Sequence, residues 1–163
     1  MTERHLKQSP PLLVRPATLD DVSSIAHIMQ KCFDPVEETH WHNQQIKEAI
    51  SGNHLSVFVI VVSDQMVGFL ITQIVVDEAE ILLIAIEPER QGVGFASHLL
   101  QGWLNAEKQK SRLKKISLEV AEDNMAAIKF YHSAHFEQVG LRKAYYKKAN
   151  GERTNAMILA RRL

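Results

Sequence analysis

Short apolar runs dominate the middle of this chain of 163 residues. Three of them, at 55–62, 66–76 and 81–86, follow one another with only a few polar residues between them. Runs of this length, bounded by turn-forming residues, are typical of strands, and such short connections favour antiparallel neighbours. We therefore predict a meander of three antiparallel strands.

A helical spacing of apolar residues marks four other segments. The first begins at Thr18, where Asp21 three positions later resembles a capping box, and Pro35 ends it. Its apolar face is formed by Leu19, Val22, Ile25, Met29 and Phe33. The other three helices are expected at 41–50, 92–110 and 124–134.

Four further strands complete the expected fold, at 12–16, 116–120, 139–147 and 154–160. The strand at 116–120 should lie parallel to 81–86 because a helix separates them in sequence. The pair Asn150-Gly151 predicts a hairpin between the last two strands. The expected fold is α/β: one domain over residues 12–163, after a flexible N-terminus at 1–11. Its mixed, mostly antiparallel sheet has about seven strands and is flanked by about four helices.

Composition narrows the class of protein further. The chain is 45% hydrophobic and 23% charged, as in ordinary globular proteins. Its apolar runs are too short to span a bilayer, and residues 1–11 lack the apolar core of a secretory signal. The single cysteine excludes an internal disulfide. We therefore expect a cytoplasmic protein without membrane association.

Net charge and its distribution bear on the partners. The formal net charge is zero, so direct nucleic-acid binding has no overall electrostatic support. Residues 1–80 carry 5 Lys/Arg and 11 Asp/Glu, whereas residues 81–163 carry 14 and 8. A basic C-terminal half suits an anionic cofactor and an acidic N-terminal half suits a cationic substrate, although solvated surfaces alone also produce such asymmetry.

The segment 81–96 has the pattern of candidate chemistry: a buried strand, a glycine turn and the start of a helix. The first N–H groups of a helix are unpaired and carry the positive end of its dipole, which favours phosphate. A plain loop is the alternative. A dinucleotide fingerprint would need glycine where Ser97 stands, and a P-loop would need Gly-Lys-Ser/Thr. What remains is Gln91-x-x-Gly94-x-Ala96.

This pattern, between a strand and a helix, resembles the cofactor signature of the GCN5-related N-acetyltransferase (GNAT) family. The resemblance implies that backbone amides of the turn hold the pyrophosphate of acetyl-CoA, the cosubstrate. It also implies that the parallel strands splay apart, so that the pantetheine arm pairs with the first of them. The turn residues are Gln91, Gly92, Val93, Gly94, Phe95 and Ala96, and the strand residues are Leu83, Ile84, Ala85 and Ile86.

A second group of candidate residues follows. Glu119 interrupts an apolar strand, which places its carboxylate either at an exposed edge or in a functional cleft. Asn124 stands at a helix start and is first of all an N-cap. Tyr131, about two turns later, is by spacing alone more typical of a core residue.

The run from Glu119 to Phe136 also matches the GNAT family, with His135 in place of a usual glycine. By this resemblance Glu119 is the general base, Tyr131 is the general acid, and Asn124 fixes the cofactor arm, caps the helix, or both. His135 departs from the family pattern at a position that often requires a positive φ, so the resemblance does not fix the geometry of this turn.

Two later stretches, 141–146 (Leu-Arg-Lys-Ala-Tyr-Tyr) and 155–159, resemble the bacterial ribosomal-protein-alanine N-acetyltransferases within this family. This implies direct acetyl transfer to the N-terminal amine of a protein, a ribosomal protein in that group. An α-amine is about 10% neutral at pH 7 and a lysine less than about 0.1%, which also favours an N-terminus. The segment after the first helix departs from the group, because Trp41 comes later than the usual tryptophan. A small amine or lysine acceptor, and a catalytically silent CoA-binding module, remain open.

The histidines and the cysteine give no second site. His40, His42, His132 and His135 lack Cys or Asp partners in a metal-ligand pattern, so we expect no metal. Cys32, beside Phe33, is expected to be a small buried hydrophobe rather than a nucleophile.

Overall fold

The computed structural model describes residues 11–33, 40–110 and 113–163. Pro35 and all but the last residue of the expected N-terminal extension lie outside these ranges. Within them, one sheet of seven strands has the order β1-β2-β3-β4-β5-β7-β6, and all neighbours except β4 and β5 are antiparallel. The strands are β1 (Leu12–Pro16), β2 (Leu55–Val62), β3 (Gln65–Val75), β4 (Glu78–Ile86), β5 (Lys115–Ala121), β6 (Glu137–Lys147) and β7 (Arg153–Arg162).

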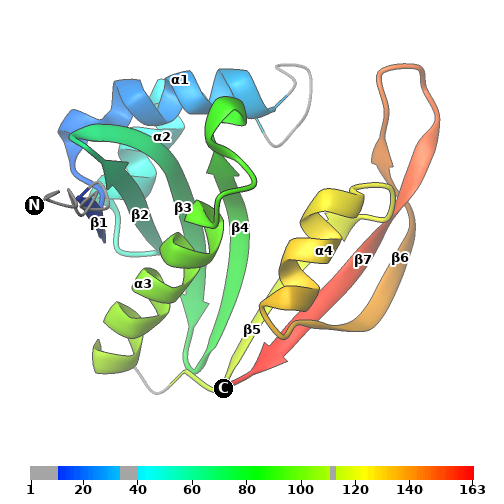
Figure 1. Cartoon of the computed structure of the whole chain (residues 1–163). Coiled ribbons are helices and arrows are strands. Elements are labelled where there is room, and N and C mark those ends of the chain that lie inside the picture. The colour runs from blue at the N-terminus through cyan, green and yellow to red at the C-terminus, as the bar shows by residue number, and fades with distance from the viewer. Residues whose placement is uncertain (1–10, 34–39, 111–112) are drawn as a thin grey trace, which may run out of the picture.

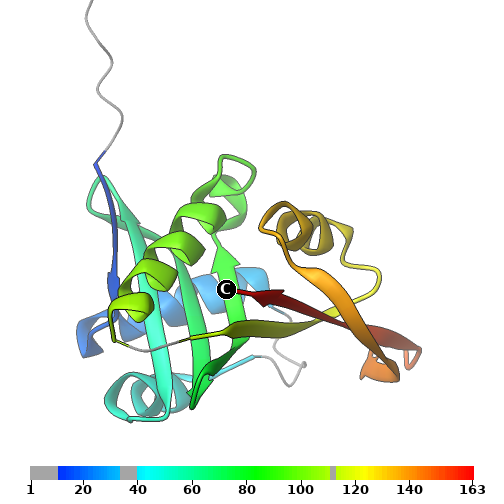
Figure 2. The ribbon, with the colours of Figure 1, turned by 90° about the horizontal axis from the view of Figure 1, so that it is seen from below.

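Helices cover both faces of this sheet (Figures 1 and 2). On one face, α1 (Val22–Cys32) and α2 (Asn43–Ser51) pack on β2, β3 and β4 around Ile25, Met29, Ile46 and Phe69. On the other, α3 (Phe95–Lys110) and α4 (Met125–Ser133) share a second core with β5 and β7 around Trp103, Leu118 and Leu159. Burial of these apolar faces is the main source of stability. The sheet therefore separates two cores.

The parallel strands β4 and β5 are paired over only part of their length. Their partners run from Glu78 with Lys115 to Ile81 with Leu118. Beyond this point β4 stays paired with β3, and β5 with β7, so the two strands diverge (Figure 1). This confirms the splayed parallel strands expected from the family resemblance.

A β-bulge in β4 lies next to the point of divergence. Ile71 pairs with Leu83 and Thr72 with Ile81, so Leu82 has no partner on β3. The bulge also changes which of the two cores the alternate side chains of β4 enter. Ala79 and Ile81 face α3, whereas Leu83 and Ala85 face α1 and α2. A bulge reverses the facing of every later residue in this way because side chains alternate along a strand.

The sequence predicted the element order but misplaced several starts by up to three residues, and two of these have clear local causes. The chain after Thr18 first forms a 3-10 turn, Leu19–Asp21, before α1 begins at Val22, which leaves Leu19 58% exposed rather than on the apolar face. The third long helix begins at Phe95 rather than at residue 92, because the glycines before it have positive φ. Of the helices described, none is long and apolar enough to cross a membrane.

Candidate active site

The turn between β4 and α3 presents a run of unpaired backbone N–H groups. Among the described residues, no backbone carbonyl accepts a hydrogen bond from the N–H groups of residues 92–97. The first helical bond runs from the His98 N–H to the Gly94 carbonyl, at 3.1 Å. Six amides at the positive end of a helix of 16 residues can bind an anion.

The two glycines of this turn are required by backbone conformation. Gly92 has φ +79° and Gly94 has φ +93°, in the left-handed region that glycine adopts without strain. A Cβ atom on Gly92 would meet nothing within 4 Å, and one on Gly94 only the His98 ring at 3.9 Å. The space in front of these amides is therefore open to a ligand.

Gln91 ties the turn to the end of β4. Its side-chain Nε2 donates to the Ile86 carbonyl at 2.9 Å, and its own N–H donates to Pro88 at 3.4 Å. The Cys32 thiol at the end of α1 donates to the same Ile86 carbonyl at 3.4 Å. Burial raises the pKa of this thiol, as expected for a cysteine that is not a nucleophile. Gln91 thus shapes the turn, and its backbone N–H is already engaged.

Glu119 is the first residue of β5 beyond the last parallel pair. It points away from the core that receives Leu118 and Val120, and its side chain is 18% exposed. One carboxylate oxygen, Oε1, lies 2.9 Å from the Arg142 Nε. The carboxylate therefore lies at the start of the opening in an ion pair, rather than at a free edge of the sheet.

Tyr131 lies on the other side of β5, in the core beneath α4. The residue is 5% exposed, and its ring contacts Phe136 at 5.5 Å and Phe130 at 5.0 Å between centroids. Burial, with a smaller effect from Tyr146, raises the pKa of Tyr131 well above its ordinary value. Its phenol therefore stays protonated throughout the physiological range and has a proton to donate.

The start and end of α4 have the conformations that the motif implied. The Asn124 side chain accepts from the Ala127 N–H at 3.2 Å, so its N-cap role is confirmed. His135 has φ +66°, the left-handed value expected at the usual glycine. The His132 ring lies 3.0 Å from the Phe136 carbonyl and helps to close this turn.

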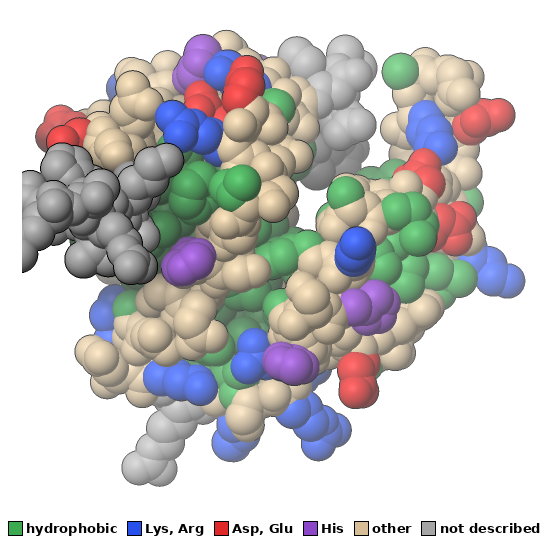
Figure 3. Space-filling model, in the orientation of Figure 1, with side chains coloured by type: hydrophobic (Ala, Val, Ile, Leu, Met, Phe, Trp, Pro, Cys, Tyr) green, Lys and Arg blue, Asp and Glu red, His purple; other side chains and the backbone are tan. Residues whose placement is uncertain are grey.

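Most of the candidates border one opening. The strand segment Leu83–Ile86, the glycine turn and Glu119 border it, and Tyr131 lies behind β5. In the space-filling view, the surface is hollowed between the two halves of the sheet, with hydrophobic side chains on its floor (Figure 3). The arrangement suits an elongated ligand with an anionic group at the turn and a less polar arm between the strands.

Sequence reasoning gave no role to Arg142 and Tyr145, although both lie in the run that suggested the subfamily. Arg142 pairs with Glu119, and its guanidinium lies 5.2 Å from the centre of the Tyr145 ring. The signal in the sequence is this run itself, which names the residues but not their partners. The partner of Arg142 is identified by the register across β5, β7 and β6, which sequence alone does not supply.

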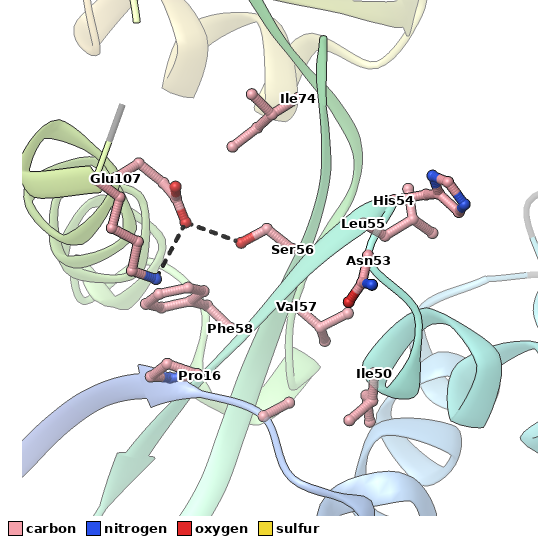
Figure 4. A pocket seen from close by; sticks show the side chains of 12 residues that line it. Pro16, Ile50, Asn53, His54, Leu55, Ser56, Val57, Phe58, Ile74 and Glu107 are labelled. Atoms are coloured by element: carbon pink, nitrogen blue, oxygen red, sulfur yellow. Dashed lines mark hydrogen bonds and ion pairs between the residues drawn. The ribbon is translucent and has the colours of Figure 1, made fainter. Parts of the chain in front are cut away.

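A separate pocket lies at the start of β2, with β3 between it and β4 (Figure 4). It has a volume of about 300 Å³ and includes the buried Glu107. The Glu107 carboxylate accepts from the Ser56 hydroxyl at 3.1 Å and lies 3.8 Å from the Lys110 ammonium. Because these groups already compensate the charge, we place the reaction at the opening instead.

Metal ligands do not gather in the part of the chain that is described: no group of three His, Cys, Asp or Glu side chains there could hold an ion. His40 and His42 contact each other edge to face, with ring centroids 5.6 Å apart.

Comparison with known proteins agrees with this geometry. Residues 22–136 match the acetyltransferase (GNAT) family model. A [ribosomal protein bS18]-alanine N-acetyltransferase of Escherichia coli K12 is 33% identical over 142 residues, which cover 86% of this chain and 90% of that protein. The protein of the same name from Haemophilus ducreyi is 37% identical over 97 residues, which cover 60% of this chain and 66% of that protein.

Solved structures give the same result. The crystal structure of the ribosomal-protein-S18-alanine N-acetyltransferase from Escherichia coli superposes with a TM-score of 0.80 at 27% identity, over 93% of this chain and 94% of that one. Arabidopsis thaliana NAA60 with a bisubstrate analogue shares the fold, with a TM-score of 0.80 at 16% identity over 93% and 98%. The family match and the splayed strands lead to one conclusion: this chain belongs to the GNAT family of acetyltransferases.

Proposed function

We propose that the protein transfers the acetyl group of acetyl-CoA directly to the N-terminal α-amine of a protein, and that this acceptor is a ribosomal protein. The observation that carries the proposal is the opening between β4 and β5, which ends at six unpaired amides. The bS18-alanine relatives, at 33% and 37% identity, support the acceptor class. Such an acceptor places the activity in the cytoplasm.

The binding of acetyl-CoA rests on two parts of the opening. The amides of Gly92 to Ala96 hold the pyrophosphate, since they are unpaired and lie at the start of α3. The free edge of β4 at Leu83–Ile86 pairs with the pantetheine arm as an added strand would. Asn124 caps α4 through its side-chain oxygen, which leaves its NH₂ group for the arm.

The chemistry divides between the two sides of β5. An N–H of β4 polarises the thioester carbonyl as negative charge develops on its oxygen. Glu119, through a water molecule, accepts the proton of the attacking amine. The phenol of Tyr131 donates a hydrogen bond to the leaving sulfur. Because burial raises its pKa, this phenol carries its proton at physiological pH, and as the general acid it passes that proton to the leaving thiolate and regains one from solvent.

An α-amine suits this site better than a lysine. Its ordinary pKa is near 8, so about a tenth is already neutral at pH 7, whereas a lysine must first lose a proton held about a hundredfold more tightly. One carboxylate is sufficient for the first amine and poorly matched to the second. The acceptor assignment therefore agrees with Glu119 as the proposed base.

Two measurements test the proposal. Turnover is compared for a peptide with a free N-terminal alanine, the same peptide with a blocked N-terminus, and a blocked peptide containing lysine. We expect acetylation of the first alone. Intact-mass spectrometry of ribosomal proteins incubated with enzyme and acetyl-CoA should then show one acetyl group on a single N-terminus. Equal turnover of the blocked lysine peptide would reject the N-terminal acceptor, and coenzyme A binding without turnover of any amine would identify a silent binding module.

A further inference from the structure

Arg142 and Glu119 form an ion pair across the half of the sheet that lies beyond the opening. Glu119 is on β5 and Arg142 on β6, with β7 between them, and Nε lies 2.9 Å from Oε1. The recorded contact is with the Oε1 oxygen of the carboxylate. The Arg142 side chain is 54% exposed, so the pair costs little desolvation and contributes little to stability. The stability of the fold therefore depends little on this pair.

An irregular stretch of β6 brings Tyr145 to the same guanidinium. In a regular strand, residues three apart face opposite sides of the sheet. Here the pairing with β7 is interrupted between Arg142 and Tyr146, and Ala144 has φ +51°. The extra length lets the Tyr145 ring lie 5.2 Å from the Arg142 guanidinium. A cation over an aromatic face is held in place by the ring quadrupole.

Side chains of β7 hold this irregular stretch in its conformation. The Asn155 side-chain oxygen accepts from the Ala144 N–H at 2.9 Å, and the Arg153 guanidinium donates to the Ala144 carbonyl at 3.0 Å. Both backbone groups of Ala144 are therefore satisfied although strand pairing is lost. Two contacts therefore hold the Arg142 guanidinium, one with Glu119 and one with the Tyr145 ring.

The same stretch reaches the other candidate catalytic group. The Tyr146 ring contacts the Tyr145 ring edge to face, with centroids 5.1 Å apart. Tyr146 also contributes, after burial, to the raised pKa of the Tyr131 phenol, so this stretch bears on the acid candidate as well.

We propose that Arg142 is a positioning residue for catalysis: it holds Glu119 Oε1 so that the other carboxylate oxygen is directed to the amine or its water, and Tyr145 holds Arg142 in turn. This inference rests on the proposed role of Glu119. It assigns Arg142 no contact with either substrate. Its loss should therefore lower kcat while the KM values for acetyl-CoA and the acceptor stay nearly constant.

A double-mutant cycle tests this assignment. Steady-state kinetics are measured for the wild type, Arg142→Met, Glu119→Gln and the double variant, with whichever amine the wild type acetylates. We expect Arg142→Met to lower kcat roughly tenfold, with Arg142→Lys recovering part of the loss, and the double variant to be no slower than Glu119→Gln. Lys143→Met, which removes the same charge from the next residue of β6, should match the wild type. Thermal unfolding of each variant confirms that it is folded.

The outcomes separate cleanly. Losses that multiply in the double variant, a wild-type kcat for Arg142→Met, or an equal loss for Lys143→Met would each overturn the positioning role. So would a fully active Glu119→Gln, which would also remove the proposed base. A wrong acceptor would appear differently, as an amine other than an N-terminus in the peptide comparison, and the cycle would then be run with that amine.

Discussion

Ile81 and Leu118 are the last residues paired across the parallel strands β4 and β5. One residue further along, Leu82 is bulged out of its pairing with β3, and Glu119 points to the opposite face from Leu118. The bulge, the divergence and the candidate base thus coincide at one level of the sheet. The site is set by where strand pairing stops, and its binding groups are mostly backbone.

Coenzyme A affinity should depend on the backbone conformation of Gly94. Alanine there would meet only the His98 ring at 3.9 Å, so the substitution strains φ +93° by about 1–2 kcal/mol without filling the site. We expect Gly94→Ala to weaken coenzyme A binding by roughly tenfold in isothermal titration calorimetry. Gly94→Glu, which adds a negative charge beside the phosphates, should abolish it.

The control for this prediction is Gly151→Ala. Gly151 has φ +86° and open space around its Cβ position, but it lies in the hairpin between β6 and β7. We expect Gly151→Ala to lower the stability of the protein by about as much as Gly94→Ala and to leave its coenzyme A affinity unchanged. Equal loss of affinity in both variants would mean that general destabilisation, rather than the turn, is responsible.

Removing the Tyr131 hydroxyl distinguishes a catalytic from a core role. The ring is packed among Phe130 and Phe136, so Tyr131→Phe should leave the thermal midpoint within a few degrees of wild type. If the phenol stabilises the leaving thiolate, kcat falls by about 10²-fold with acetyl-CoA KM unchanged. Glu119→Gln should also lower kcat alone. An unchanged kcat for Tyr131→Phe would leave that residue as core only.

The stability of the protein should respond to pH through Asp21. The Arg15 guanidinium, which donates to both carboxylate oxygens at 2.7 and 3.0 Å, holds the pKa of this carboxyl below its ordinary value. A lowered folded-state pKa stabilises the protein above the unfolded value of about 3.9, and this contribution is lost as pH falls through the folded value. Asp21→Asn should therefore cost about 1–3 kcal/mol at pH 7 and less near pH 2, where part of this contribution is lost.

Urea denaturation at the two pH values measures this difference. Asp20→Asn is the matched control, because it removes the same charge from the neighbouring exposed residue. It should change stability by less than about 0.5 kcal/mol at either pH. A pH-independent cost of Asp21→Asn would show that the hydrogen bond from the Thr18 N–H, at 2.7 Å, matters more than the charge.

Glycine at residue 135 should stabilise the protein. His135 has φ +66° at the end of α4, which costs a residue with a Cβ about 1–2 kcal/mol, while glycine loses up to about 1 kcal/mol more entropy. We expect a net gain of about 0.5–1 kcal/mol for His135→Gly in chemical denaturation. Ser133→Gly, two residues earlier and still helical, should be destabilising by a similar amount.

Local patterns and the family motif account for what could be predicted from the sequence. The spacing from Gln91 to Ala96 predicted a candidate anion site, and the structure has the positive-φ glycines and unpaired amides on which that prediction depends. Thr18 and Asp21 likewise predicted the capping interaction, although the 3-10 turn that follows displaced Leu19 to the surface. The N-cap role of Asn124 was predicted from its residue type at the start of a helix, and the structure confirms it.

Contacts between distant residues could not be predicted in the same way. The pairing of Glu119 with Arg142 depends on two registers and on the irregular stretch of β6, and neither leaves a periodic signal. The bulge at Leu82 also has no signal in the sequence, because the run around it is uniformly apolar. Even the prediction that β4 and β5 diverge came from the family resemblance rather than from the residue pattern. Strand geometry of this kind reflects the packing of both cores.

The divergence of β4 from β5 also exposes two inner borders whose peptide groups lack strand partners. Bare borders of this kind can pair with another polypeptide, which is the first step of aggregation. A thioester cosubstrate lying along β4 would mask that border. We expect protein freed of coenzyme A to aggregate at a lower temperature than protein saturated with it. Light scattering during heating measures this difference. The cosubstrate would then serve the solubility of the protein as well as its reaction.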